Sequence, residues 1–192
     1  ISVAPWEPLA LRRETSVPDP AVAMTNVDSA SEPSRAVPPA PGALCRPYDV
    51  ESLRAAGALV GRRARIAPDV TVDCPERLEI GDDVEIGAGV RLMTAGGGTI
   101  GDRAIISPGA QVLSSTPSIP RRGRPVSAAP PLSAQIDVDA DAWIGPGAIL
   151  LPGVQVGAAA IVLAGSVVAG SVANSRIVRG NPASYHMTRN HI

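Results

Sequence analysis

Few side chains of this sequence could take up or transfer a proton near neutral pH. Its only histidines, His186 and His191, lie in the last seven residues of the chain. Three aspartates, Asp137, Asp139 and Asp141, alternate directly after a long loop. A positioned imidazole or carboxylate can act as a general base, which removes a proton from an attacking group. Solvated tail histidines and exposed turn carboxylates are the simpler interpretation, and the sequence leaves both open.

Cysteine content and charge exclude several classes of function. Cys45 and Cys74 form neither a CxxC motif nor a ligand-like cluster, so we expect reduced thiols and no metal site. The formal net charge is −1, which gives no overall attraction to nucleic acid or anionic membranes. No apolar run approaches the ~20 residues of a membrane span. We therefore expect a cytoplasmic protein with neither nucleic acid nor membrane as a partner.

The elements that must position any site repeat every six residues. A period of six fits neither a lone helix nor a two-sided strand, and it is typical of a parallel β-helix. Aromatic residues make up only 2% of the chain, which suits a narrow interior filled by aliphatic side chains. The aliphatic residues that keep this period are Val60, Ile66, Val72, Ile80, Ile86, Leu92, Ile100, Ile106, Val112, Val138, Ile144, Leu150, Val156, Val162 and Val168.

Insertions interrupt the repeat only between groups of three hexads. Three hexads make one triangular coil, so the sequence predicts about five coils with all insertions at one corner. Five strands spaced about 4.8 Å apart give a prism about 24 Å long. The insertions are residues 73–79, 93–99 and the long loop 113–137. A loop of this length is either a functional lid or a surface excursion, and the three arginines that it carries are Arg121, Arg122 and Arg124.

The remaining segments flank this all-β repeat. Prolines and missing apolar periodicity predict disorder at the N-terminus. Asp49 can cap a short helix that ends near Gly57 and covers the open end of the prism. The predicted segments are a disordered Pro/Ala/Ser-rich tail (1–47), a capping helix (48–59), the β-helix (60–172) and a C-terminal tail (173–192) in which Ile177 and Val178 could add a strand.

Particular stretches within the repeat resemble one protein family. AWIGPGAILLPGVQVG, then LAGSVV and IVRGNPAS, together with RLEIGDDVEIGAGVRLMTAGGGTIGDRAIISPGAQVL, resemble the hexapeptide-repeat O-acetyltransferases, most closely the exopolysaccharide, maltose and galactoside acetyltransferases. The resemblance covers roughly residues 58–186. It implies a left-handed β-helix, a homotrimer, and acetyl-CoA as acyl donor in a groove between subunits. The acceptor that it implies is a hydroxyl of a saccharide or a similar small molecule.

The resemblance also implies roles for individual residues. It places Trp143 in the cleft near the acetyl group, although Trp143 could instead pack under the long loop. Ala164, Gly165 and Ser166 correspond to a backbone ledge along which the pantetheine lies, and Pro182 belongs to a later turn that faces the cofactor. Ordinary corner packing would explain the ledge residues equally well.

The chain departs from the family at both ends of this site. The position of the family's catalytic histidine, next to Thr116, is occupied by Pro117, which can neither accept nor donate the proton. A general base commonly contributes about 10²–10⁴-fold to the rate, so its loss should cripple transfer. Basic residues that the family often carries near the cofactor are replaced by Gly170 and Ser184.

Two functions therefore stay open, with an enzyme favoured. The first is a weakened acetyl-CoA-dependent O-acyltransferase, for which Thr116, Pro117, Trp143, Asp139 and Asp141 are the cleft candidates. Asp137 and His186 are further substitutes for the base. The second is an inactive homologue that serves as a trimeric scaffold or binding module. A γ-class carbonic anhydrase is excluded because it needs three metal-binding histidines and the coils contain none; a serine acetyltransferase fits badly because the long helical N-terminal domain is missing.

Overall fold

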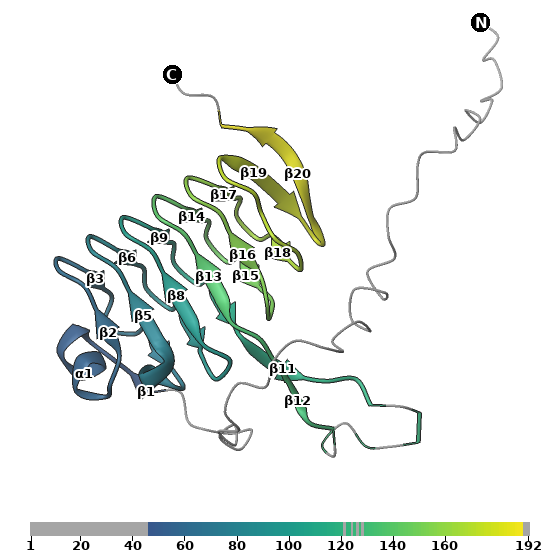
Figure 1. Ribbon diagram of the computed structural model, residues 1–192, viewed down its shortest axis with the longest axis horizontal. Coiled ribbons are helices and arrows are strands. Elements are labelled where there is room, and N and C mark those ends of the chain that lie inside the picture. Colours follow the sequence, from purple (N-terminus) through teal and green to yellow (C-terminus); the bar gives the residue numbers. More distant parts are fainter. Residues whose placement is uncertain (1–45, 121, 124, 126, 128, 190–192) are drawn as a thin grey trace, which may run out of the picture. The chain divides into compact units, whose positions relative to one another are not determined.

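The computed structural model of the chain describes residues 46–120, 122, 123, 125, 127 and 129–189. The predicted disordered tail lies outside the described residues except for Arg46 and Pro47. In the described part, very short strands wind into stacked coils, three strands to a coil (Figure 1). This is the predicted parallel β-helix.

Three sheets form the sides of the prism, and their strands are parallel except β1 and β20. Sheet A contains β1 (Arg46–Pro47), β4 (Thr71–Val72), β7 (Arg91–Met93), β10 (Gln111–Leu113), β15 (Ile149–Leu150) and β18 (Val167–Val168). Sheet B contains β2 (Leu59–Val60), β5 (Leu78–Ile80), β8 (Gly98–Ile100), β13 (Ile136–Val138) and β16 (Gln155–Val156). Sheet C contains β3 (Arg65–Ile66), β6 (Glu85–Ile86), β9 (Ile105–Ile106), β14 (Trp143–Ile144), β17 (Ile161–Val162), β19 (Arg176–Gly180) and β20 (Ala183–Thr188).

Each coil runs from sheet B to sheet C and then to sheet A. We call the three edges the B/C, C/A and A/B corners after the sheets that they join. Residues one coil apart are paired in register, as Ile106 is with Ile144 and Ile144 with Val162. Each corner therefore presents one column of equivalent residues along the prism.

The hexad residues fill the interior as predicted. Ile86, Ile106, Ile144, Val156 and Val162 are buried, with at most 2% of their surface exposed. Ile66 is half-buried and packs on the core from the first coil, where no further coil covers it. The register read from the sequence is confirmed.

The prism has about six turns, one more than the number of complete coils predicted. The prediction stopped at Val168 because Asn174, six residues later, is polar. In the structure the next inward residue after Val168 is Val172, only four residues later, and it forms a β-bridge with Val156. The following inward residue is Val178 in β19, six residues after Val172. Asn174 lies instead at the B/C corner, where its Oδ1 accepts the N–H of Ala158 at 3.1 Å.

The predicted helix covers the N-terminal end of the prism. It is α1 (Val50–Ala55), and Asp49 caps it: the Asp49 carboxylate accepts the Ser52 N–H at 2.8 Å, and Ser52 Oγ accepts the Asp49 N–H at 2.9 Å. Leu53 is fully buried against the core. The chain leaves the helix through Gly57, whose φ of +97° favours glycine.

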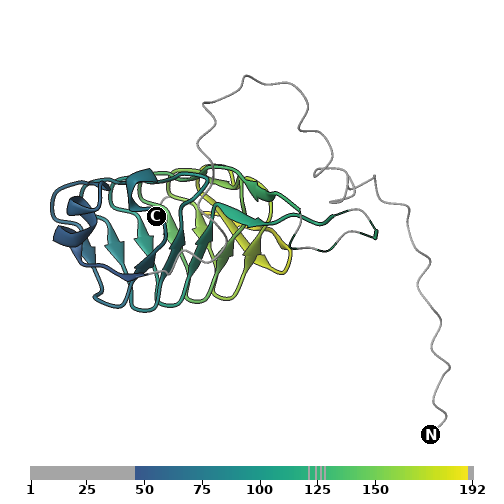
Figure 2. The ribbon, with the colours of Figure 1, turned by 90° about the horizontal axis from the view of Figure 1, so that it is seen from below.

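All three insertions leave the A/B corner. The first forms the short helix η1 (Pro75–Arg77), and the second forms a turn at Thr94–Gly97. The third forms a hairpin of β11 (Ser115–Pro117) and β12 (Pro131–Ser133), which are antiparallel. Figure 2 shows this hairpin, which we call the arm, projecting from the coils.

Candidate functional site

The C/A corner carries a column of glycines with left-handed backbone conformation. Gly89, Gly109, Gly147 and Gly165 have φ values of +67°, +71°, +64° and +67°. A Cβ added at Gly147 or Gly165 would meet no atom within 4 Å, so the space outside this corner is open. We call Gly109, Gly147 and Gly165, with the backbone around them, the glycine ledge.

The B/C corner adopts the same backbone conformation without glycine. Its left-handed residues have φ values between +55° and +60°, and they are Arg63, Asp83, Arg103, Asp141, Ala159 and Ser175. This conformation costs a non-glycine residue on the order of 1 kcal/mol. Since the fold tolerates that cost six times at one corner, backbone geometry alone does not explain why side chains are missing at the other. The glycine ledge is an open backbone surface.

Trp143 lies beside the glycine ledge. It projects from the outer face of sheet C between its register partners Ile105 and Ile161, and 39% of its surface is exposed. Its indole Nε1–H donates to Ser107 Oγ at 2.8 Å, and Ser107 is the first residue of the C/A corner. The indole is therefore held at the C/A corner, whereas the arm leaves the A/B corner.

The predicted cofactor-binding residues come together at the C-terminal end of this corner. Ser166 is fully buried, and its Oγ accepts the Gly180 N–H at 3.2 Å. The neighbouring Leu163 N–H donates to Val178 O at 3.0 Å. These contacts place Ala164–Ser166 beside the turn that contains Pro182, whose peptide bond with Asn181 is cis.

Thr116 and Pro117 lie elsewhere on the chain. Both belong to β11 of the arm, where Thr116 is opposite Leu132 and Pro117 is opposite Pro131. Sheet A separates the A/B corner, from which the arm leaves, from the C/A corner with the glycine ledge. One chain therefore does not bring Pro117 and Trp143 into a common cleft.

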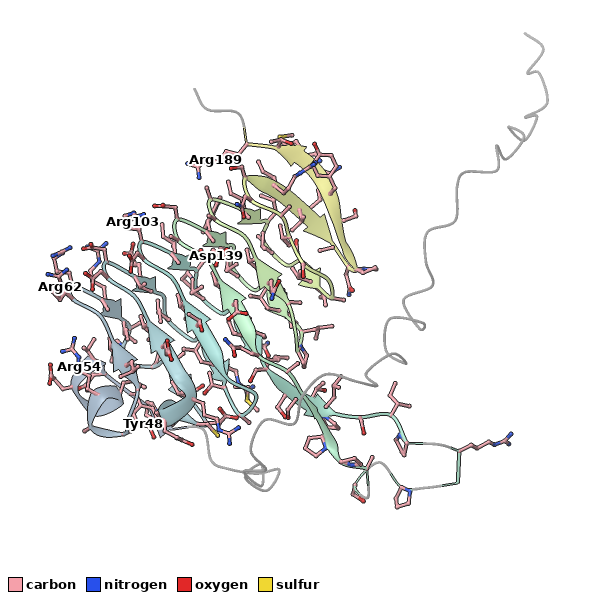
Figure 3. All side chains as sticks on the ribbon, in the orientation of Figure 1. Tyr48, Arg54, Arg62, Arg103, Asp139 and Arg189 are labelled. Carbon is pink, nitrogen blue, oxygen red and sulfur yellow. The ribbon has the colours of Figure 1, made fainter. Side chains whose placement is uncertain are left out.

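Asp137 lies in β13 of sheet B, whereas Asp139 and Asp141 follow it in the B/C corner, where Figure 3 labels Arg103 and Asp139. Both oxygens of Asp141 accept from Arg103, at 2.8 and 2.7 Å, and these hydrogen bonds hold the pKa of Asp141 below its usual value. A carboxylate stabilised in this way is a poor proton acceptor. Asp137 accepts from Gln135 Nε2 at 2.7 Å, and Asp139 is exposed.

The other residues singled out by the sequence are dispersed. Gly170 is exposed after β18, and Ser184 and His186 lie on β20. Arg122 is exposed, while Arg121 and Arg124 lie outside the described residues. Burial raises the pKa of the Cys74 thiol to about 11, which keeps it protonated.

The described residues hold neither a metal-binding cluster nor a membrane-spanning helix. No group of three or more His, Cys, Asp or Glu side chains in that part of the chain could hold a metal ion. No helix there is long and apolar enough to cross a membrane. The cytoplasmic location stays a prediction.

Comparison with known proteins identifies the family. No profile of a known protein family matches the chain. WcaF of Escherichia coli strain K12, whose name describes a colanic acid biosynthesis acetyltransferase, is 30% identical over 131 residues, which are 68% of this chain and 69% of WcaF. This chain belongs to the hexapeptide-repeat acetyltransferases.

Solved structures agree with this family. A hexapeptide-repeat acetyltransferase of Vibrio cholerae, crystallised with acetyl-CoA, superposes with a TM-score of 0.68 and 27% identity over 72% of this chain and 75% of that one. A galactoside acetyltransferase in complex with coenzyme A has a TM-score of 0.66 at 23% identity, covering 73% and 70%, and shows the likeness in fold alone. The predicted resemblance to this family is confirmed.

Ser107 is a residue of this corner that was not predicted from the sequence. The sequence offers one hint, because Ser107 occupies a corner position that is Ala67, Gly87, Gly145 and Leu163 in the other coils. Only the contact with the indole shows why a hydroxyl at that position matters.

Proposed function

We propose that this chain is an acetyl-CoA-dependent O-acyltransferase that acts on a hydroxyl of a saccharide or a similar small acceptor. The glycine ledge beside the Trp143 indole is the observation that carries this proposal. Membership of the acetyltransferase family supports it, as do the acetyl-CoA and coenzyme A complexes of proteins with this fold.

The residues of the C/A corner fit the acyl donor. Pantetheine is a long, narrow chain, and a backbone without side chains lets such a chain approach closely. Gly147 and Gly165 leave that space open, and Trp143 supplies an apolar wall beside it. Ser166 fixes the turn with Pro182 at the end of the ledge. When bound, acetyl-CoA supplies an acetyl group activated as a thioester.

The acceptor hydroxyl must lose its proton during attack on this thioester. Pro117 cannot take up that proton, and the Arg103 pair makes Asp141 a poor substitute. We therefore propose a transfer rate lowered by up to the ~10²–10⁴-fold that a positioned base supplies. Asp137, Asp139 and His186 are the groups from which a weaker base would come.

We propose that a neighbouring subunit completes the cleft in a homotrimer. The outer face of sheet C begins with Arg65 and Glu85 and then carries an apolar column of Ile105, Trp143, Ile161 and Ile177, which is partly exposed in the single chain. The corresponding column of sheet B begins with the exposed Leu59 and is polar from there on, with Glu79, Thr99, Asp137 and Gln155. Apolar surface of this kind marks a subunit contact. The arm of one subunit, with Pro117, would then face Ala164–Ser166 of its neighbour.

A transfer assay tests this function. The protein is incubated with acetyl-CoA and a panel of mono- and oligosaccharides, and the free thiol of coenzyme A and the mass of each acceptor are followed. We expect one acceptor to gain the mass of an acetyl group as thiol is released. Binding of acetyl-CoA without transfer to any acceptor would contradict the enzyme and favour a trimeric binding module.

A further inference from the structure

We propose that Ser107 is a positioning residue that fixes the Trp143 indole against the glycine ledge. The proposal rests on the function proposed above, since it gives the ledge a cofactor to hold. Its basis is the 2.8 Å hydrogen bond from Trp143 Nε1–H to Ser107 Oγ, which joins two residues that are 36 positions apart.

The fold places these two residues together through strand register. Trp143 pairs with Ile105 of the preceding coil, and Ser107 follows Ile105 by two residues, at the start of the C/A corner. The Ser107 N–H donates to Ile144 O at 2.9 Å, which fixes the serine backbone directly beside β14. Only 8% of Ser107 is exposed, so its hydroxyl is held in a fixed position.

The pairing is specific to this coil. The equivalent corner residues in the other coils are Ala67, Gly87, Gly145 and Leu163, and none has a side chain that could accept a hydrogen bond. Trp143 belongs to a column of outward-facing residues along sheet C. In the other coils this column carries Arg65, Glu85, Ile105, Ile161 and Ile177. Among the described residues, the one hydroxyl at this first corner position thus lies next to the one tryptophan of sheet C.

An orienting role follows from the partial exposure of Trp143. A half-exposed indole on a sheet surface can occupy several rotamers, and its N–H can turn to water instead of the protein. The Ser107 hydroxyl selects the rotamer in which the ring lies at the C/A corner. A neutral hydrogen bond of this kind contributes modestly, so we expect its loss to weaken acetyl-CoA binding roughly fivefold.

The first experiment measures the indole directly. In a Trp6→Phe background Trp143 is the only tryptophan. Ser107→Ala should increase quenching of its fluorescence by acrylamide and shorten its anisotropy decay, while the thermal midpoint stays within a few degrees. Ser107→Thr, which keeps the hydroxyl, should restore the wild-type signal, and Ser171→Ala, an exposed serine on another side, should change nothing.

The second experiment is a double-mutant cycle on acetyl-CoA affinity by calorimetry, with Ser107→Ala, Trp143→Phe and the pair. We expect Ser107→Ala to raise the Kd roughly fivefold beside Trp143 and to have no effect in the Trp143→Phe background. An equal effect in both backgrounds would overturn the proposal, as would unchanged quenching in the first experiment. If none of the proteins binds acetyl-CoA, the proposed function is wrong and the positioning role falls with it, even where quenching shows the hydrogen bond.

Discussion

At the scale of single residues, arginine–aspartate pairs line the B/C corner. Arg63 contacts both oxygens of Asp83 at 2.6 Å, and Arg103 contacts Asp141 in the same two-pronged way. Figure 3 shows Arg62 and Arg103 on this edge of the prism. Each pair joins neighbouring coils, so it helps to offset the cost of the left-handed backbone at these positions.

These pairs predict acid sensitivity. The hydrogen bond from Arg103 lowers the pKa of Asp141 below its ordinary value of 3.8, so the pair stabilises the fold above that value and the stabilisation is lost as pH falls below it. Asp141→Asn should lower the urea midpoint at pH 6, and the difference from wild type should shrink toward pH 3. Asp139→Asn, at a carboxylate with no ion pair among the described residues, is the control. A difference that stays constant with pH would refute this assignment.

Replacing Pro117 tests the missing base. If the site is otherwise intact, Pro117→His should raise acetyl transfer by up to about 10²–10⁴-fold, with acetyl-CoA affinity unchanged. The substitution also frees φ and adds an N–H in β11, which reduces the gain if the arm relaxes. Initial rates and calorimetry measure the two quantities. A slower variant would mean that another base works in the wild type, and Asp137, Asp139 and His186 would be mutated next.

At the scale of elements, the sequence predicted what depends on local repetition. Within each predicted coil the strands lie one hexad apart, so periodicity alone identified the inward residues and the common corner of the insertions. The last coil escaped because the step from Val168 to Val172 drops to four residues. The arm was expected only as a loop, because the pairing of β11 with β12 depends on contacts across an irregular, proline-rich segment. The Ser107–Trp143 contact was not predicted either, because its two residues are 36 positions apart in the sequence.

The stacked core predicts large costs for interior truncation. Ile144 is fully buried between Ile106 and Val162 of the adjacent coils. Ile144→Ala should therefore lower the free energy of unfolding by about 2–5 kcal/mol, since stacked strands cannot collapse into the cavity. Gln155→Ala, on the exposed face of sheet B, should change it by less than about 0.5 kcal/mol. Urea denaturation of both variants measures the difference, and equal effects would contradict the register.

At the scale of the whole molecule, the contrast between sheets B and C predicts how copies associate. Light scattering at micromolar concentration should give the mass of a trimer. Ile161→Glu introduces a charge into the apolar column of sheet C and should reduce the mass, whereas Gln155→Glu on sheet B should leave it unchanged. A wild-type monomer would contradict the proposed trimer, and dissociation by the sheet B variant alone would show that the wrong face was chosen.

If the glycine ledge holds acetyl-CoA, a side chain added to the ledge must weaken the binding that calorimetric titration with acetyl-CoA measures. Asparagine tolerates left-handed backbone, so Gly165→Asn places a side chain on the ledge with little strain. Ala159→Asn makes a matched change at the B/C corner, where φ is +55° against +67° at Gly165. We expect wild type and Ala159→Asn to bind acetyl-CoA equally and Gly165→Asn to lose at least tenfold in affinity. Equal binding by all three proteins, or no binding by the wild type, would show that acetyl-CoA does not lie on the glycine ledge.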